Sequence, residues 1–437
     1  MEPHEVPPVN SSSPSHRKPW LWVPSLYFAQ GIPYVVVMTV SVIMYKRLGI
    51  SNTEIALYTS WLYLPWVIKP LWSPVVDLLK TKRFWILTTQ FVVGVCLALV
   101  ALTIPMSSFF QYTLAIFWLM AFSSATHDIA ADGFYMLGLE QHEQAAYVGV
   151  RSALYRVAMI TGQGLLVVLA GELEVAHGGN ISVAWAITFG ILSGLFLLFF
   201  VYHRFILPYP PADRAAVSEA HANPAAEFFR VFVLFFKKKD ILLILAFLLL
   251  YRFAEAQLVK LVSPFLLDPR ERGGLGLTTS EVGVVYGTVG IIALTLGGLL
   301  GGYAASRKGL KYWLWPMVCS IHLPDLAFVY LSYVQPTNFY VINAAVAIEQ
   351  FGYGFGFTAY LLYMIMVSEG EHKTAHYAIC TGFMALGMML PGMFSGWLQE
   401  NIGYRYFFLW VMLSTVPGFL VTAFVKIEPG FGKKQSS

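Results

Sequence analysis

The chain has 437 residues, of which 57% are hydrophobic and 12% carry a charge, and its mean hydropathy is +0.64. A soluble globular domain carries roughly 25% charged residues, so this composition excludes an ordinary water-soluble protein. The formal net charge of +4 could suit an acidic partner such as nucleic acid. The basic residues, however, cluster in short loops beside apolar segments, where membrane topology explains them. We therefore expect a membrane protein and no nucleic-acid partner.

The N-terminus and the cysteines limit the possible functions further. Residues 1–16 are rich in Pro, Ser and Glu and hold no apolar run, so we expect residues 1–19 to be a disordered cytoplasmic tail and not a signal peptide. The three cysteines, Cys96, Cys319 and Cys380, lie singly in separate apolar segments, without the spacing of a metal site. No G-x-x-x-x-G-K-[ST] run exists, which disfavours ATP-driven transport. We expect no metal and no cofactor.

Apolar stretches of roughly 20 residues recur along the chain, each long enough to cross a hydrocarbon layer of about 30 Å as a helix. With errors of a few residues at each boundary, the first six spans are expected at 20–45, 52–76, 84–105, 109–136, 144–170 and 181–204. Six more are expected at 241–265, 279–304, 311–334, 338–367, 374–399 and 404–425. The sequence predicts an all-α polytopic membrane protein with twelve transmembrane helices in two six-helix halves.

A proline-rich, charged stretch separates the two halves. Residues 206–227 hold four prolines, a composition typical of an exposed linker. Residues 228–239 set five phenylalanines beside Arg230 and three lysines, which fits either an amphipathic helix at the membrane interface or a frayed start of the seventh span. The expected units are an N-terminal bundle over 20–205, a cytoplasmic linker over 206–240, a C-terminal bundle over 241–426 and a cytoplasmic tail over 427–437.

The distribution of lysine and arginine predicts the orientation. If the N-terminus is cytoplasmic, most basic residues fall in the inside loops. The outside loops then hold only Lys46, Arg47, Arg270, Arg272 and Arg405. Because short cytoplasmic loops carry the excess of positive charge, we expect both termini in the cytoplasm.

Nine ionisable side chains are expected at membrane depth. They are Lys69, Asp128, Asp132, Arg156, Arg252, Glu255, Lys260, Asp325 and Glu349. On insertion scales, each such group at a helix centre costs about 3 kcal/mol of free energy in contact with lipid. These groups must therefore face inward. In the fold of two halves with inverted repeats, spans 1, 4, 7 and 10 line the central path, and most of the polar residues fall on them. The expected substrate contacts are Gln30, Tyr34, Arg156, Tyr251, Arg252, Glu255, Gln257 and Gln350.

Three carboxylates are candidates for proton coupling. Asp128 and Asp132 are four residues apart and share a helix face, where like charges repel, so one of them can take up a proton in a dehydrated site. The alternative is that one of them pairs with Arg156 on the next span. Glu349 has no local partner in the sequence and is the third candidate.

Other polar residues admit simpler roles. Arg252 and Glu255, three residues apart, either satisfy each other or act in gating or binding. Lys69, near three tryptophans, is either a substrate contact or a base that snorkels to the interface. Asp325 is expected to be structural. His127 neighbours Asp128 but points to another side of the helix, which argues against a catalytic or metal role.

Glycines crowd two of the expected spans. Span 8 holds two overlapping G-x-x-x-G pairs, and span 10 holds three alternating glycines. They are Gly297, Gly298, Gly301 and Gly302, followed by Gly352, Gly354 and Gly356. Small residues at such spacing let membrane helices approach closely.

Three segments carry a resemblance to a known family. The first runs from Gly31-Ile32-Pro33 through Leu48-Gly49-Ile50-Ser51 to Lys69-x-Leu71-Trp72-x-Pro74-x-x-Asp77. The second is Ser124-Ala125-Thr126-His127-Asp128-Ile129-x-x-Asp132, and the third is Tyr155-Arg156. The sequence resembles the AmpG-type muropeptide permeases and the related acetyl-CoA transporters of the major facilitator superfamily. It departs from their pattern at His127, where the family has Gln, and at Gly133, where it has Ala.

The resemblance implies the major facilitator fold and proton-driven import of N-acetylglucosaminyl-anhydromuramyl peptide across a bacterial inner membrane. Asp77, which ends the first motif, is expected to form a cytoplasmic gating loop with Lys80 and Arg83. The expected partners are a small polar or anionic solute, protons and the lipid bilayer, and we expect a monomer.

Two other functions compete with this interpretation. A transporter of the same fold for a siderophore, an acyl-CoA or a drug has the same general features. An intramembrane enzyme or a membrane sensor is the alternative of another class. It is disfavoured because no histidine and acid are placed to act together near a membrane surface.

Overall fold

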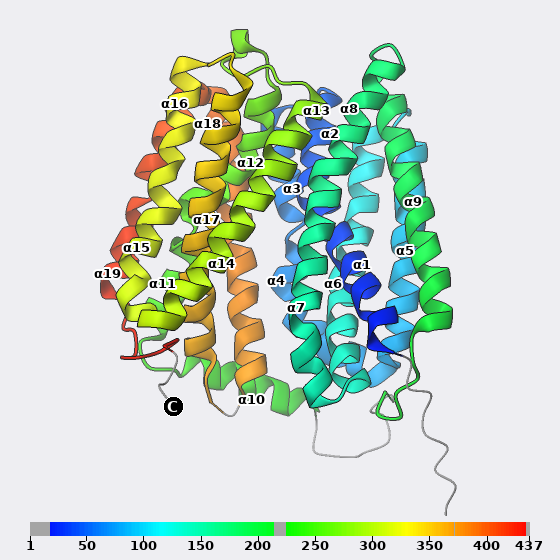
Figure 1. The fold of residues 1–437 in the computed structure, drawn as a ribbon, viewed down its shortest axis with the longest axis vertical. Helices are drawn as coiled ribbons and strands as arrows, with labels where there is room; N and C mark the ends of the chain where they lie inside the picture. The colour runs from blue at the N-terminus through cyan, green and yellow to red at the C-terminus, as the bar shows by residue number, and fades with distance from the viewer. Residues whose placement is uncertain (1–17, 214–223, 371, 434–437) are drawn as a thin grey trace, which may run out of the picture.

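The computed structural model describes residues 18–213, 224–370 and 372–433, which fold into a bundle of long helices (Figure 1). Within these residues, ten helical segments are long and apolar enough to cross a membrane. They are Pro19–Arg47, Lys82–Thr103, Phe109–Gly138, His142–Ala176, Ile181–Ile206, Ile241–Leu267, Thr279–Lys308, Leu310–Val334, Phe339–Ser368 and Lys373–Phe424. The predicted all-α, multi-pass architecture is confirmed.

The N-terminal half runs from η1 to α9. Its elements are η1 (Pro19–Leu21), α1 (Val23–Val35), η2 (Val36–Val40), α2 (Ser41–Arg47), α3 (Asn52–Trp61), α4 (Leu64–Leu79), α5 (Lys82–Thr103), α6 (Phe109–Gly138), α7 (Gln141–Ile160), η3 (Thr161–Leu165), α8 (Leu166–Ala176) and α9 (Ile181–Ile206). Polar caps fix several helix starts. Ser51 and Glu54, for example, form a reciprocal capping box at the start of α3, which satisfies two backbone groups that a helix end leaves free.

The C-terminal half runs from α10 to α19. Its elements are α10 (Pro224–Phe236), α11 (Ile241–Leu250), α12 (Phe253–Leu267), η5 (Arg270–Arg272), α13 (Thr279–Val282), η6 (Gly283–Gly290), α14 (Ile291–Lys308), α15 (Leu310–His322), η7 (Leu323–Asp325), α16 (Leu326–Val334), α17 (Phe339–Ser368), α18 (Lys373–Leu413) and α19 (Val416–Phe424). The rod of α11 and α12 is interrupted at Tyr251 and Arg252. Arg252 therefore stands at the start of α12, in the middle of a span.

The expected spans coincide with these helices to within a few residues, except in two places. The second expected span is divided into α3 and α4 at Leu62 and Tyr63, and each part is shorter than a full crossing. The eleventh and twelfth expected spans lie in α18 and α19, where Gly403 interrupts the helix with φ +75°. Glycine tolerates this left-handed conformation because it lacks a Cβ atom. The number twelve thus stays a prediction.

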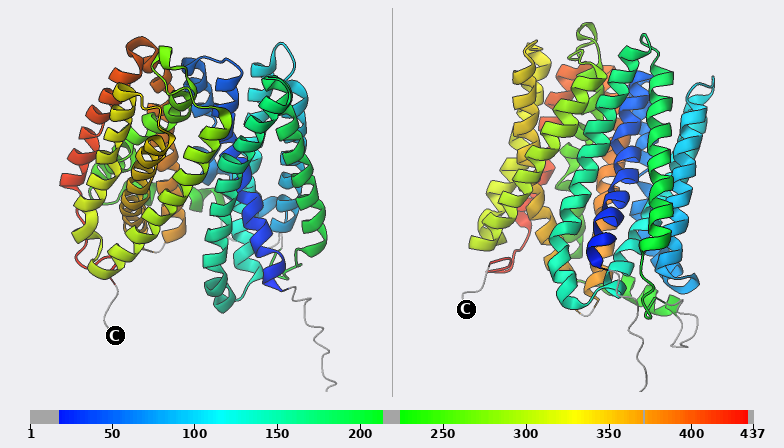
Figure 2. Two further views of the ribbon diagram at one scale, coloured as in Figure 1. Left: turned by 45° about the horizontal axis from the view of Figure 1, so that its top comes forward. Right: turned by 45° about the vertical axis from the view of Figure 1, so that its right-hand side comes forward.

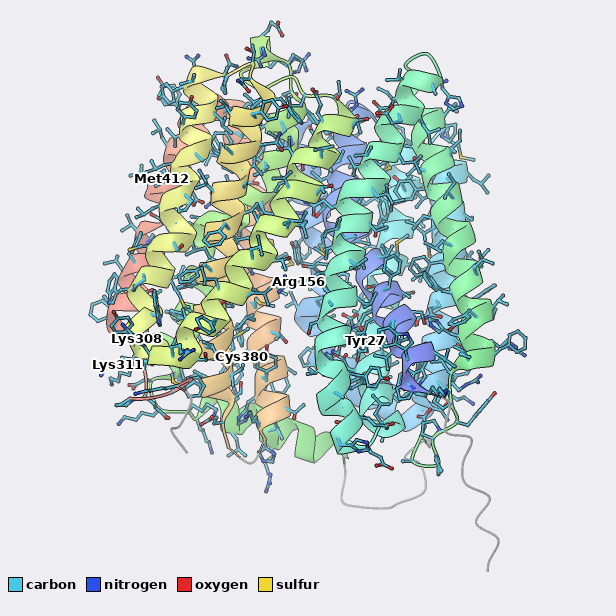
Figure 3. The ribbon with its side chains drawn as sticks, in the orientation of Figure 1. Tyr27, Arg156, Lys308, Lys311, Cys380 and Met412 are labelled. Atoms are coloured by element: carbon cyan, nitrogen blue, oxygen red, sulfur yellow. The ribbon has the colours of Figure 1, made fainter. Side chains whose placement is uncertain are left out.

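The two halves stand side by side, with the N-terminal half on the right in Figure 1, and Figure 2 shows the same division from two other directions. The described chain begins and ends at the lower edge in Figure 1, which we call the termini side. The opposite edge is the far side. Lys308 and Lys311, which end α14 and begin α15, also lie at the termini side (Figure 3).

The helix α10 resolves one alternative left open by the sequence. It is separate from α11 and runs across the termini side of the molecule (Figure 1), so this segment is not a frayed start of the seventh span. Phe235 at its end is buried and packs against His376 and Phe383 of α18, with ring centroids 5.5 and 6.5 Å away. Residues 214–223 of the predicted linker and residues 1–17 of the predicted tail lie outside the described residues.

The glycine-rich segments of spans 8 and 10 lie at close helix–helix contacts, as the sequence predicted. Helices α14 and α17 pack tightly along their lengths. A Cβ atom on Gly297 would collide with the backbone of Phe351 and Phe355, and one on Gly354 would collide with Leu294. Gly297 and Gly354 are therefore required at this interface, because backbone lies against backbone there.

Large apolar side chains cover the outer surface of the bundle. Exposed examples with more than half of their surface free are Leu102, Leu198, Phe205, Leu242, Leu299 and Phe424. In water such a surface would aggregate, whereas in a bilayer it contacts lipid. The chain is a multi-pass membrane protein.

Candidate functional site

The two aspartates of α6 each contact a base of the N-terminal half. The Lys69 Nζ atom lies 3.5 Å from Asp128 Oδ2, and the indole N–H of Trp66 donates to the same oxygen at 3.2 Å. Asp132 pairs with Arg151 at 3.0 Å and accepts a hydrogen bond from the Tyr27 hydroxyl at 3.2 Å. Both carboxylates are therefore compensated in this conformation.

The pairing partner differs from the one that the sequence suggested. Arg156 contacts neither aspartate. Its Nη1 atom lies 3.4 Å from the Thr295 hydroxyl of α14, in the other half, and Figure 3 places it at mid-height where the halves meet. Arg151 and Arg156 are five residues apart, which turns a helix by about 140°. Arg151 therefore faces α6, while Arg156 faces the C-terminal half.

Aromatic and basic side chains from both halves converge near the centre. Tyr34 and Trp66 pack edge to face with ring centroids 5.3 Å apart. From the other half, the Arg252 guanidinium lies 4.6 Å from the Phe357 ring and donates to the Tyr353 hydroxyl.

The two sets are close to each other. Lys260 of α12 lies with its Nζ atom 5.3 Å from the ring centroid of Tyr63 in the other half, and it donates to Thr59 of α3 at 2.9 Å. Tyr34, Trp66, Tyr353 and Phe357 remain partly exposed although they lie within long helical rods.

The remaining predicted substrate contacts occupy different surroundings. Gln257 accepts from the Trp410 indole at 2.8 Å, which turns it toward α18. Tyr251 is fully buried and donates to the Gly356 carbonyl at 2.9 Å. Gln30 is buried, and its amide oxygen has no hydrogen-bond partner. Gln350 donates to Glu349 at 3.0 Å. Arg252 and Tyr34 are thus brought near one another, whereas Gln257 and Tyr251 serve contacts inside the C-terminal half.

Three carboxylates meet inside the C-terminal half. The oxygens of Glu255, Asp325 and Glu349 that face one another all lie within 4.8 Å, and each residue is at most 1% exposed. Two unit charges 4.8 Å apart repel by about 3.5 kcal/mol at an effective dielectric constant of roughly 20. Glu255 does not pair with Arg252, which was one of the two sequence alternatives, because both of its oxygens lack a hydrogen-bond partner. The sequence does not predict this cluster, since it favours a structural role for Asp325.

His127 belongs to a buried hydrogen-bond chain. Its Nε2 atom lies 3.0 Å from the Gln90 amide nitrogen, the Gln90 oxygen lies 2.9 Å from His203 Nδ1, and His203 Nε2 lies 2.9 Å from the Ser25 hydroxyl. The chain ties α6, α5, α9 and α1 together. It gives His127 a structural partner on another helix.

A polar network joins the two halves on the far side, and sequence reasoning missed it. Lys46 of α2 and Asp268, which follows α12, form an ion pair at 2.7 Å, with side-chain exposures of only 13% and 7%. The Tyr404 hydroxyl donates to the same aspartate at 2.6 Å. A second contact is made by Glu174 of α8, which pairs with Arg47 at 2.7 Å. These residues lie at the ends of spans, where sequence alone predicts solvated loop charges.

Glu174 also reaches the other half. It accepts a hydrogen bond from the Thr279 hydroxyl at 2.9 Å and from the Trp185 indole at 3.0 Å. Close backbone packing accompanies the polar contacts, since a Cβ atom on Gly171 would meet Ser280. Polar contacts and close backbone packing thus join the two halves on the far side of the molecule.

The predicted gating loop lies at the termini side. Lys80 is exposed, with its Nζ atom 5.8 Å from the Phe84 ring centroid. The Arg83 guanidinium stacks on Tyr209 at 3.9 Å, and its backbone N–H donates to Asp213 at 3.0 Å. The loop is thus anchored to the segment that follows α9. The side chain of Asp77 lies outside the described part.

The sequence profile of the Major Facilitator Superfamily matches residues 25–368. The chain belongs to the major facilitator superfamily. Members of this superfamily are transporters, so the chain is a membrane transporter of a small solute and not an enzyme. The superfamily fold, two six-helix halves around a path, matches the side-by-side halves seen here.

Similar curated proteins cover most of the chain. The anhydromuropeptide permease of Escherichia coli (strain K12) is 25% identical over 408 residues, which cover 91% of this chain and 77% of the permease. The putative transporter AmpG 4 of Rickettsia conorii is 25% identical over 424 residues, covering 92% of this chain and 95% of its own. The resemblance to AmpG-type permeases is confirmed.

Solved structures support the fold. A mutant of the nucleoside transporter NupG aligns with a TM-score of 0.70 at 16% identity and covers 92% of this chain and 99% of its own. A bacterial homologue of the human lysosomal transporter Spinster, in an inward-facing and unoccupied conformation, aligns with a TM-score of 0.67 at 15% identity. It covers 94% of this chain and 96% of its own.

Proposed function

We propose that the chain is a proton-coupled secondary transporter that imports anhydromuropeptides by alternating access. The observation that carries the proposal is the convergence of Tyr34 and Trp66 from one half with Arg252 and Phe357 from the other. An anhydromuropeptide combines sugar rings with peptide carboxylates. Guanidinium groups match carboxylates in charge and geometry, and aromatic faces with a few polar groups are typical of a binding site.

The similarity to named permeases supports this substrate class over others. The relative from Escherichia coli is named an anhydromuropeptide permease. In this chain Arg156 and Arg252, one from each half, are suited to hold carboxylates. The further contacts proposed from the sequence are Gln30, Tyr34, Tyr251, Glu255, Gln257 and Gln350. Of these, Tyr251 and Gln257 must first leave their hydrogen bonds inside the C-terminal half.

Proton coupling is proposed at Asp128, Asp132 and Glu349. Protonation of Asp128 removes the charge that holds Lys69 at 3.5 Å, so proton binding releases a contact between α4 and α6. A local change of charge of this kind biases a two-state element. The released Lys69 is then free to meet an anionic solute.

The proposed location is a bacterial inner membrane with both termini in the cytoplasm, so that the far side faces the periplasm. The bundles 20–205 and 241–426 then rock against each other, with residues 206–240 as their link and with Asp77, Lys80 and Arg83 as a cytoplasmic gating loop. The ion pair between Lys46 and Asp268 and the contact between Glu174 and Thr279 join the halves on the far side. Breaking them is the step that admits solute from the periplasm.

Uptake of labelled anhydromuropeptide into proteoliposomes, with and without an imposed proton gradient, tests the proposal. Accumulation is expected only with the gradient. The variant Asp128→Asn is expected to lose gradient-driven accumulation while it still inserts and folds. Asp240→Asn is the control, because this aspartate pairs with Lys426 on the surface. Uptake without a gradient, or equal loss in both variants, overturns the proposal.

The same vesicles distinguish the competing functions. A siderophore, an acyl-CoA and a drug are offered in place of the muropeptide. Accumulation of one of these in place of the muropeptide supports the transporter function but assigns it a different substrate. If Asp128→Asn has no effect on any flux, a sensor or scaffold role is favoured.

A further inference from the structure

Three buried acids from separate elements of the C-terminal half share one small space. They are Glu255 in the first turn of α12, Asp325 in η7 and Glu349 in α17. Their facing oxygens lie within 4.8 Å of one another. The acids are 0%, 1% and 1% exposed, respectively.

Local backbone features bring the acids together. The break at Arg252 starts a new helix and places Glu255 in its first turn. Pro324 removes a backbone donor, and at this point α15 gives way to the short η7 that carries Asp325. Gly352, which lies one turn after Glu349, lets α15 and η7 approach α17, since a Cβ atom there would collide with the Ser320 carbonyl and with Pro324.

The site lacks the partners that compensate buried acids elsewhere in the chain. Both oxygens of Glu255 and both oxygens of Asp325 have no hydrogen-bond partner, although these side chains are fully buried and face the cluster. Within the described residues, Glu349 accepts a hydrogen bond only from Gln350. Asp128 and Asp132, by contrast, each contact a base.

The charged and titratable neighbours of the cluster are few. Arg252 stands at the cap of α12, one turn before Glu255, and Tyr286 and Tyr353 interact electrostatically with Glu255 and Glu349. The tyrosines are neutral at physiological pH. Three carboxylates and one guanidinium leave two negative charges without compensation. Because uncompensated charge is strongly disfavoured inside a protein, two positive charges must enter from outside.

We propose that Glu255, Asp325 and Glu349 form a single site that holds two protons, and that both are coupled to transport. The inference rests on the proposed proton-coupled function and deepens it, because it assigns two protons to one site and adds Glu255 and Asp325 to the coupling residues. When loaded, the site holds two carboxylic acids and one carboxylate, which faces Arg252. When unloaded, both protons have left to water.

Arg252 links this site to solute binding. It contacts Tyr353 and Phe357 among the converging aromatic residues and also acts on Glu255. A solute carboxylate that binds Arg252 screens its positive charge from the cluster, which favours protonation of the acids. Thermodynamic linkage is reciprocal, so protonation of the cluster also strengthens solute binding. Solute and protons therefore each strengthen the binding of the other, as symport requires.

The first test needs no solute. Infrared difference spectra of the purified protein record the C=O stretch of protonated carboxylic acids at neutral pH. Asp325→Asn is expected to lose about half of the band that belongs to the cluster. Two carboxylates and the Arg252 guanidinium then leave one negative charge, which a single proton compensates, instead of two. Glu255→Gln and Glu349→Gln are expected to do the same.

Glu174→Gln is the matched control, because Glu174 is a buried carboxylate that is paired with Arg47 and hydrogen-bonded by Trp185 and Thr279. It is expected to leave the band unchanged. An unchanged band in all three cluster variants overturns the proposal. So does saturable binding of Na⁺ or Ca²⁺ to the wild-type protein that is lost in Glu349→Gln, since the cluster is then a metal site.

The second test measures stoichiometry. In proteoliposomes held at zero membrane voltage, the pH gradient that just balances a solute gradient reports the number of protons moved per solute, whatever charge the solute carries. At least two are expected for the wild-type protein, and one fewer for Asp325→Asn. A wild-type value of one overturns the two-proton site. If no muropeptide flux is found but the infrared bands fall as expected, the substrate proposal fails while the proton site stands.

Discussion

The ion pair between Lys46 and Asp268 offers a direct way to shift the conformational equilibrium. The pair joins the two halves at 2.7 Å with little exposure. Removing one partner of a fully buried pair costs roughly 3 to 5 kcal/mol. We expect about 2 to 3 kcal/mol for Asp268→Asn, because Lys46 keeps 13% exposure and retains its hydrogen bond to Asn52. The cost falls only on the state closed at the far side.

This energy predicts a measurable change in population. Since about 1.4 kcal/mol is tenfold in an equilibrium constant, the ratio of far-side-closed to far-side-open molecules falls roughly 30- to 140-fold. Spin labels on cysteines at Ala176 and Glu271, which are exposed residues on opposite halves, report the opening by pulsed electron paramagnetic resonance. The native cysteines are first replaced by alanine. Asp268→Asn is expected to add a longer distance to the wild-type distribution.

Two comparisons make this test specific. Asp240→Asn breaks a surface pair with Lys426, whose side chain is 74% exposed, and pairs of this kind contribute little. Its distance distribution should equal the wild-type one. The exchanged pair Lys46→Asp with Asp268→Lys should recover most of the closed population. Identical distributions for Asp268→Asn and Asp240→Asn would refute the reasoning that the far-side pair holds the halves together.

Further predictions concern packing and the buried hydrogen-bond chain. Gly297→Ala is expected to lower thermal stability in detergent by about 1 to 3 kcal/mol through overpacking against α17. Gly302→Ala, with open space around its Cβ position, should gain about 0.5 to 1 kcal/mol from helix propensity, and equal effects of the two would contradict the assigned interface. Gln90→Leu leaves His127 and His203 each without one partner, and we expect unfolding to become easier by about 1 to 3 kcal/mol. The melting temperature measures each effect, and an unchanged value for Gln90→Leu would mean that water replaces the lost bonds.

Much of the fold could be predicted because a bilayer imposes simple rules on sequence. A span must be apolar and roughly 20 residues long, so helices such as α5 and α9 were expected to within two residues of their observed bounds. The glycines of α14 and α17 likewise carried a local signal, since close helix packing in lipid requires small residues. The interruptions at Tyr63 and Arg252 were not predicted. At the first of these, Pro65 in the first turn of α4 has no N–H to donate to the carbonyl of Trp61, where α3 ends, so a local signal was present. No proline or glycine lies within four residues of Arg252.

The candidate site was predictable only in part. Apolar surroundings alone indicate that Asp128, Asp132 and Glu349 face inward, because a lipid-exposed charge is costly. Which base meets which acid could not be read from spacing. Arg151 takes the place expected of Arg156 because rotation along α7 decides which side faces α6.

The sequence by itself determined that the chain is a membrane protein, which segments are apolar enough to cross the bilayer and which residue types must be sheltered from lipid, since these follow from local hydropathy and charge. Only the tertiary structure decided that Asp325 joins Glu255 and Glu349 and that Lys46 meets Asp268. These contacts link positions far apart in the chain. Their distances depend on how whole helices are shifted and turned against each other, and no local pattern encodes that.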